Sequence, residues 1–305
     1  MTLKKILMVA VVVAVLVACG DDDSSFATRP SDGSSSSVTP QNVTLSEVEG
    51  SSDSETSVSS SSTKPSSSSV ESSSSSSVPE GYVDPSTVVK GTMTDERDGQ
   101  TYKTVTIGTQ TWMAENLNYA YTDVPYNYTL NDSSYTSDST SWCYKDSAEY
   151  CAKYGRLYTW AAAMDSVGTW STNGKGCGYK STCTPTCPVR GICPEGWHLP
   201  DTTEWHTLFT AVGGKSTAGK MLKSTSGWNS SGNGTDSYAF SALPAGGRYD
   251  AGGYGHGGAV ASFWSSSQKA DSVAYHVLLF YYLDVAEDHT SSNKYYGFSV
   301  RCLKD

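Results

Sequence analysis

The segment Pro200-Asp-Thr-Thr-Glu-Trp-His-Thr-Leu-Phe-Thr-Ala-Val-Gly-Gly214 has the features of one amphipathic helix. Asp201 or Thr202 follows the proline as a helix cap, and Glu204 lies where it can close a capping box. The apolar residues repeat at i, i+3, i+4 and i+7, which places them on one helical face: Trp205, Leu208, Phe209 and Val212. The pair Gly213-Gly214 ends the pattern. We therefore predict a helix from residue 201 or 202 to residue 212.

Short helical and β patterns surround this helix. Asp146 is typical of a helix N-cap, and Glu149 is the acidic residue expected three positions later. Gly155 is expected to end this helix. A second short helix is predicted over 158–165. Runs rich in β-branched and aromatic residues predict strands over 101–107, 111–113, 238–243, 261–265, 274–285 and 295–303. The first two are expected to pair as a hairpin after Gly108. Short helices early and antiparallel strands later are typical of the α+β class.

Serine dominates the first part of the chain. Of the 54 residues from Ser24 to Ser77, 26 are serine, and no aromatic residue occurs between Phe26 and Tyr82. Such a segment buries too little apolar surface to offset the entropy of ordering, so we predict a disordered linker over 19–81. The remainder, 82–305, is long enough to form one domain with a core. It has 21 acidic and 17 basic residues, a net charge of −4, which argues against a nucleic-acid partner.

The N-terminus has the pattern of an export signal. Lys4 and Lys5 precede the apolar run 6–18, which is shorter than the roughly 20 residues that span a bilayer. The run ends in Leu16-Val-Ala-Cys19, which resembles a bacterial lipobox, so we predict a signal peptide over 1–18 and lipidation of Cys19. The alternative is an ordinary secretory signal with an incidental cysteine. The acidic cluster Gly20-Asp-Asp-Asp23 resembles the surface-export signal of Bacteroidota-type lipoproteins, which indicates a protein exposed on the outer membrane and held there by lipid alone.

Seven cysteines follow Cys19: Cys143, Cys151, Cys177, Cys183, Cys187, Cys193 and Cys302. An exported protein meets an oxidising compartment, so disulfides are expected. An odd number leaves at least one thiol unpaired or joined to a second chain. The spacings between residues 177 and 193 do not give the two C-x2–4-C pairs of a structural zinc site. We therefore predict no metal site, and no cofactor.

Seven ordered segments resemble the Fibrobacter succinogenes major paralogous domain family: 98–108, 110–119, 154–160, 193–200, 240–244, 263–267 and 300–302. The last three read Phe240-Ser-Ala-Leu-Pro244, Phe263-Trp-Ser-Ser-Ser267 and Val300-Arg-Cys302. Together the segments extend over about 95–304. The resemblance implies a C-type-lectin-like fold and a cell-surface or secreted setting, and it brings no established activity.

The same resemblance implies three disulfides, Cys193–Cys302, Cys143–Cys151 and Cys177–Cys183. Cys187 stands where an aromatic residue is usual in this family, so it is expected to be the odd thiol. A Cys193–Cys302 bond closes a loop of over 100 residues and would contribute about 4–5 kcal/mol on the loop-entropy model.

Calcium-dependent sugar binding is not predicted, because the motifs Glu-Pro-Asn, Gln-Pro-Asp and Trp-Asn-Asp are absent. The stretch Gly246–Gly258 has seven glycines in 13 residues, with aromatic and polar residues between them. Aromatic rings offer apolar faces to sugars and polar edges for hydrogen bonds. We predict a ligand surface made of Trp228, Asn229, Arg248, Tyr249, Tyr254, His256, Tyr281 and Tyr282. The alternative is that the tryptophans are core residues and the tyrosines are strand formers.

Catalytic chemistry is not predicted. Formylglycine-generating enzymes share a lectin-like fold and use paired C-terminal cysteines, but only Cys302 follows Cys193 here. The histidines show no H-E-x-x-H spacing, and no G-x-S-x-G elbow occurs. The sequence thus indicates a surface lipoprotein whose lectin-like domain binds glycan or plant-fibre polysaccharide. The alternatives are a surface protein–protein interaction module, in which Cys187 would cross-link an assembly, and an enzyme related to the formylglycine-generating enzymes.

Overall fold

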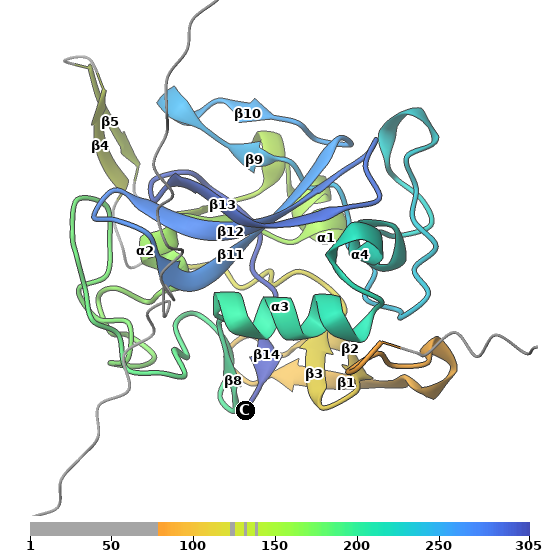
Figure 1. Ribbon diagram of the computed structural model, residues 1–305. Helices are drawn as coiled ribbons and strands as arrows, with labels where there is room; N and C mark the ends of the chain where they lie inside the picture. The colour runs from red at the N-terminus through yellow and green to blue at the C-terminus, as the bar shows by residue number, and fades with distance from the viewer. Residues whose placement is uncertain (1–78, 123–125, 131–132, 138–139) are drawn as a thin grey trace, which may run out of the picture. The chain divides into compact units, whose positions relative to one another are not determined.

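A computed structural model describes residues 79–122, 126–130, 133–137 and 140–305 (Figure 1). The predicted signal peptide, the lipidation site Cys19 and nearly all of the predicted linker lie outside these residues and stay predictions. Within the described ranges, no helix is long and apolar enough to cross a membrane.

An antiparallel sheet of five strands joins the two ends of the described chain. Its order is β1 (Val89–Asp95), β2 (Gln100–Ile107), β3 (Gln110–Met113), β14 (Leu303–Lys304) and β8 (Trp197–His198). The predicted hairpin of β2 and β3 is confirmed, with Ile107 paired to Gln110. Leu303 pairs with Trp112 on one side and His198 on the other, so the last strand completes the sheet.

A second antiparallel sheet consists of β11 (Val260–Gln268), β12 (Val273–Phe280) and β13 (Ala286–Asn293). Its register pairs Ser262 with Leu278 and Phe263 with Val277. Successive strand residues point to opposite faces. Phe263 and Val277 therefore share one face of this sheet, and Ser262 and Leu278 share the other.

The predicted main helix is α3 (Thr202–Ala211). The Asp201 carboxylate accepts from the Glu204 backbone N–H at 2.8 Å, and the Glu204 carboxylate accepts from the Asp201 backbone N–H at 2.9 Å. The capping box is therefore confirmed. A second helix, α4 (Lys215–Leu222), follows directly.

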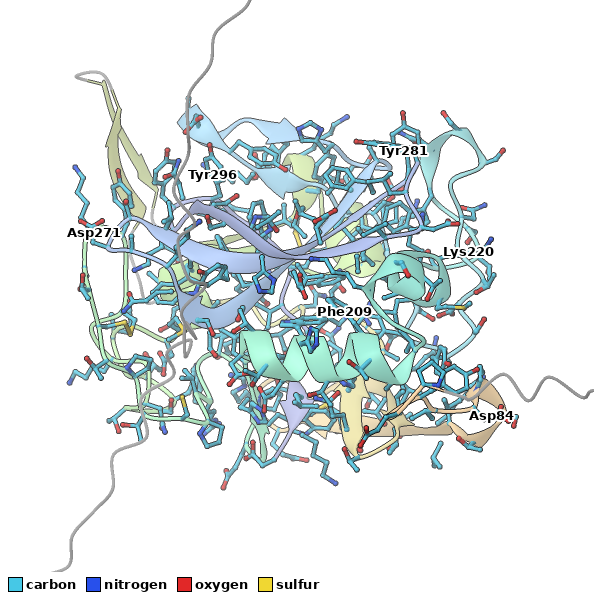
Figure 2. The ribbon with its side chains drawn as sticks, viewed as in Figure 1. Asp84, Phe209, Lys220, Asp271, Tyr281 and Tyr296 are labelled. Carbon is cyan, nitrogen blue, oxygen red and sulfur yellow. A yellow bond between two sulfur atoms is a disulfide. The ribbon has the colours of Figure 1, made fainter. Side chains whose placement is uncertain are left out.

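The apolar face of α3 lies between the two sheets (Figure 1). The Trp205 ring is 4.6 Å from Trp112 of β3 and 5.7 Å from Phe263 of β11, measured between centroids. Figure 2 shows Phe209 pointing from the helix toward the three-stranded sheet. One helical face thus forms the core with both sheets.

The other elements are short. They are α1 (Ala148–Tyr154), α2 (Trp160–Ala163), the strands β4 (Tyr126–Leu130), β5 (Ser133–Ser137), β6 (Ser141–Trp142), β7 (Leu157–Tyr158), β9 (Gly247–Arg248) and β10 (Tyr254–Gly255), and four 3-10 turns, Pro85–Thr87, Tyr144–Asp146, Asn229–Ser231 and Asp250–Gly252. This mixture of short helices and antiparallel sheets confirms the α+β prediction. The helix expected to start at Asp146 starts at Ala148, because Asp146 ends a 3-10 turn.

Two predicted strands are wrong. Residues 238–243 form only an isolated bridge between Ala242 and Lys223, and 295–303 contributes strand residues only at its end. Phe240 and Phe298 lie in these segments, and both are buried. Their aromatic character therefore reflects core packing, and Phe298 in addition forms an isolated antiparallel bridge with Tyr158.

One strand boundary also differs from the prediction, and some strands were not predicted. The strand expected over 274–285 ends at Phe280. The strands β1 and β13 were not predicted, because both are rich in polar residues and lack a clear alternation of apolar side chains. Their pairing comes from their neighbours β2 and β12, which have stronger strand patterns.

The Arg301 side chain is completely buried and joins separate segments of the chain. Its partners and donor–acceptor distances are Asn116 Oδ1 (2.6 Å), Met113 O (3.1 Å), Phe240 O (2.5 Å) and Ser241 O (2.9 Å). Burial lowers the pKa of Arg301 to about 9, so the guanidinium is charged at neutral pH. The cation is therefore stabilised by one amide and three backbone dipoles.

Three disulfides join pairs of cysteines within the described residues: Cys143–Cys151, Cys177–Cys183 and Cys193–Cys302. They are the pairings that the family resemblance implies. The expectation that Cys187 is the odd thiol is wrong, because Cys187 is disulfide-bonded and no cysteine among the described residues is free. A cross-linked assembly through an unpaired Cys187 thereby loses its basis.

Replacing Arg301 by methionine should lower the free energy of unfolding by about 3–5 kcal/mol, because four buried acceptors lose their donor. Denaturant unfolding of the purified protein measures this loss. The matched control is Lys304→Met, which removes an exposed cation from β14 and should change stability by less than about 1 kcal/mol. Equal effects of the two substitutions would contradict the role given to Arg301.

Candidate functional site

A pocket of about 300 Å³ opens on the face of the β11–β12–β13 sheet that carries Ser262. We call it the sheet pocket. It is lined by Tyr249, His256, Val260, Ser262, His276, Leu278, Phe280, Thr290, Ser291, Ser292 and Phe298. Of the eight predicted ligand residues it brings together two, Tyr249 and His256.

The strand register creates the floor of this pocket. Ser262 pairs with Leu278, and Trp264 pairs with His276, so these side chains share one face. On β13, Thr290 pairs with His276 across a register shift that adds one residue to β13. Such bulges change the direction in which side chains point, and they are common beside functional sites. The floor therefore carries hydroxyl and imidazole groups on an otherwise apolar surface.

His276 is only 3% exposed. Its Nε2 lies 3.0 Å from Ser292 Oγ, and its ring lies 4.8 Å from the Phe298 ring. Among the described residues, no group forms a hydrogen bond of good geometry with its Nδ1, and the Val277 backbone only partly opposes the effect of burial on its pKa. Burial lowers the pKa of His276 to about 4, so the ring is neutral at physiological pH. Nδ1 is an acceptor when Nε2 carries the proton, and a donor in the other tautomer.

Ser262 is completely buried, and its Oγ has no hydrogen-bond partner in the described part of the chain. A buried polar group left without a partner costs about 1–3 kcal/mol, and most such groups are satisfied. Ser262 Oγ and His276 Nδ1 belong to residues that line the same pocket. A bound hydroxyl compound or water that reaches these two atoms from the pocket would satisfy both of them.

Aromatic side chains form the walls. The Tyr249 ring centroid lies 5.4 Å from His256 and 6.0 Å from Phe298. Burial raises the pKa of Tyr249 to about 12, so its phenol stays protonated. The loop that carries Tyr249 is attached to β11 by a hydrogen bond from Gly246 N to Val260 O at 2.8 Å. The pocket thus combines a polar floor with apolar ring faces.

The glycines of this loop allow Tyr249 to take its position. A Cβ atom on Gly247 would lie 2.8 Å from Tyr249 Oη, and one on Gly255 would lie 3.3 Å from the Tyr249 ring. Only the absence of a side chain permits the first approach. Two of the seven glycines in 246–258, Gly247 and Gly255, therefore allow the close packing of this aromatic wall.

Trp228, Asn229 and Arg248 lie outside the pocket. Trp228 is 6% exposed, and its Nε1 donates to Ser224 Oγ at 3.0 Å, so it is a core residue without a face for a ligand. Asn229 is exposed, and its backbone N–H donates to Gly258 O at 2.7 Å. The Arg248 guanidinium lies 3.9 Å above the Trp142 ring.

The three other predicted tyrosines are also outside the pocket. Tyr254 donates its hydroxyl to Asp146 Oδ1 at 2.5 Å. Tyr281 is half-buried and meets Tyr282, which is 64% exposed, edge to face at 5.0 Å. The predicted residues therefore do not converge on one surface.

Several pocket residues could not be singled out from sequence patterns: Ser262, His276, Thr290, Ser292 and Phe298. The one available signal is Ser262, a polar residue inside the apolar run Val260–Trp264. Recognising that it shares a face with His276 requires the register between β11 and β12.

A larger cavity of about 490 Å³ borders His198 at the start of α3. His198 Nδ1 lies 2.7 Å from Asp305 Oδ1, and Nε2 lies 2.9 Å from Glu204 Oε1. Burial opposes its charge, but these two carboxylates prevail and raise the pKa of His198. Both nitrogens are already bonded, so this histidine is a structural link rather than a ligand position. In the described ranges, no three His, Cys, Asp or Glu side chains are grouped to hold a metal ion.

A family model described as the Fibrobacter succinogenes major domain matches residues 105–304. The matched range includes every residue of the sheet pocket. No curated protein and no solved structure matches the chain. The C-type-lectin-like fold that the resemblance implies therefore stays a prediction.

The buried His276 should make the protein less stable in mild acid. Its pKa is about 4 when folded and about 6.5 when unfolded, so between these values the unfolded chain takes up a proton that the folded chain does not. The free energy of unfolding should fall by about 3 kcal/mol from pH 7 to pH 4 through this group. Denaturant unfolding across that range should give a flatter profile for His276→Gln than for the wild type. Parallel profiles would contradict a depressed pKa.

Proposed function

The chain belongs to the Fibrobacter succinogenes major domain family, and from this premise we propose that it is a surface lipoprotein whose family domain binds carbohydrate in the sheet pocket. Binding without turnover is proposed. Cys302, the cysteine that a formylglycine-generating enzyme would need as part of a reactive pair, forms a disulfide with Cys193.

One observation carries this proposal. Two buried polar atoms, Ser262 Oγ and His276 Nδ1, lack partners among the described residues and belong to a pocket walled by Tyr249 and Phe298. A sugar presents hydroxyl groups around its ring edge and apolar C–H groups on its faces. Hydroxyls would satisfy the floor, while C–H faces would lie against the aromatic walls.

The sequence supports the surface setting. The predicted lipobox ending at Cys19, the acidic cluster after it and the serine-rich linker would together hold the domain away from an outer membrane. A Cys19→Ala variant should leave the membrane fraction and lose incorporation of labelled fatty acid. Its persistence in the membrane fraction would contradict the lipid anchor.

The protein-interaction alternative has weaker support. The exposed large apolar side chains of the described residues are Tyr82, Val89, Val167 and Tyr282. They come from four separate segments, whereas a protein interface usually has a contiguous apolar centre. Tyr249 and His256 of the glycine-rich loop are instead packed at the sheet pocket.

Purified, oxidised protein should be retained by at least one glycan on an array, and Tyr249→Ala should weaken that retention by about tenfold or more, since an aromatic wall is lost. Tyr275→Ala is the matched control, because Tyr275 lies on β12 outside the pocket. Absence of retention on every glycan, or equal losses in both variants, would contradict carbohydrate binding at this site.

A further inference from the structure

We propose that the sheet pocket takes one uncharged sugar residue at the end of a glycan, rather than an internal stretch of chain or a fibre surface. This inference rests on the carbohydrate binding proposed above. It specifies the class of ligand by its size, its charge and its hydroxyl groups.

The small volume of the pocket favours a ligand of about one ring. It measures about 300 Å³, which is at the lower end of the range of about 300–1,000 Å³ found for small-molecule sites. Recognition is therefore concentrated on a single residue.

The lining favours an uncharged ligand. None of the residues that line the pocket is Asp, Glu, Lys or Arg. A uronic acid would bury a carboxylate there, and an amino sugar would bury an ammonium group, in each case without a counter-charge. Desolvation of an unpaired ion is costly, so both should be excluded. The neutral imidazole of His276 and the hydroxyl of Ser262 match sugar hydroxyls instead.

The spacing of the two unpartnered groups suits one ring. Ser262 pairs with Leu278, so His276, two residues earlier on β12, is its diagonal neighbour. Diagonal neighbours in an antiparallel pair have Cβ atoms about 7 Å apart or somewhat less. Two hydroxyl groups on different carbons of one pyranose ring can therefore bind Ser262 and His276 at the same time, one hydroxyl to each side chain.

The aromatic side chains offer no flat platform for a fibre. Trp228 is in the core, and Tyr281 meets Tyr282 at an interplanar angle of 77°. Figure 2 shows Tyr281 and Tyr296 well apart from each other, on the side of the sheet opposite α3. Coplanar rings spaced along a surface, which a crystalline polysaccharide would need, are absent among these residues. The predicted plant-fibre ligand is therefore less favoured than a soluble glycan end.

Calorimetric titration of the whole purified protein tests this inference. The probes are methyl glycosides of neutral hexoses and pentoses, their uronic-acid and amino-sugar counterparts, and oligosaccharides of increasing length that end in the same neutral residue. One neutral methyl glycoside should bind within about tenfold of the longest oligosaccharide, and its charged counterparts should bind at least about tenfold more weakly. Ser262→Ala should weaken binding of that glycoside by about three- to tenfold, through loss of one hydrogen bond.

Ser226→Ala is the matched control, because Ser226 is an exposed serine outside the pocket. It should leave the affinity unchanged. Affinity that rises steeply with chain length, or tighter binding of a charged sugar, would overturn the inference while leaving carbohydrate binding intact. Binding of no saccharide at all would overturn both the inference and the proposed function.

Discussion

Arg301 places a full positive charge in the interior, where its hydrogen-bond partners are the Asn116 amide and three backbone carbonyls. Such a charge is tolerated only where the surrounding dipoles are held in place. The partners come from residues 113–116 and 240–241, and the neighbouring Cys302 is bonded to Cys193. These positions fall within four of the segments that resemble the family. The resemblance is thus concentrated where distant parts of the chain meet around one buried cation.

The contacts of Arg301 also connect the core of the fold to the candidate site. The Arg301 guanidinium lies 5.5 Å from the Phe263 ring, and Phe263 faces α3 from β11. With Phe263 fixed toward the helix, strand alternation turns its neighbour Ser262 to the other face, where it meets the pocket. A shift of one residue in this register would exchange the two faces. The polar floor is therefore a consequence of how the core is packed.

Local signals in the sequence predicted α3, the β2–β3 hairpin and the α+β class, because each depends on neighbouring residues. The family resemblance supplied the three disulfides. The pocket was only partly predictable: Tyr249 and His256 were named, whereas Trp228 proved to be a core residue. Ser262 and His276 come from different strands, and their meeting depends on strand pairing that no local pattern specifies. Burial, which separates a ligand-binding tryptophan from a core tryptophan, likewise depends on the whole fold.

A crystal structure of the protein soaked with the saccharide that binds most tightly tests the central claim most directly. The account predicts one sugar ring in the sheet pocket, with hydroxyl oxygens about 3 Å from both Ser262 Oγ and His276 Nδ1, and a ring face against Tyr249 or Phe298. A sugar bound elsewhere, with the pocket filled by water or closed by side chains, would contradict it.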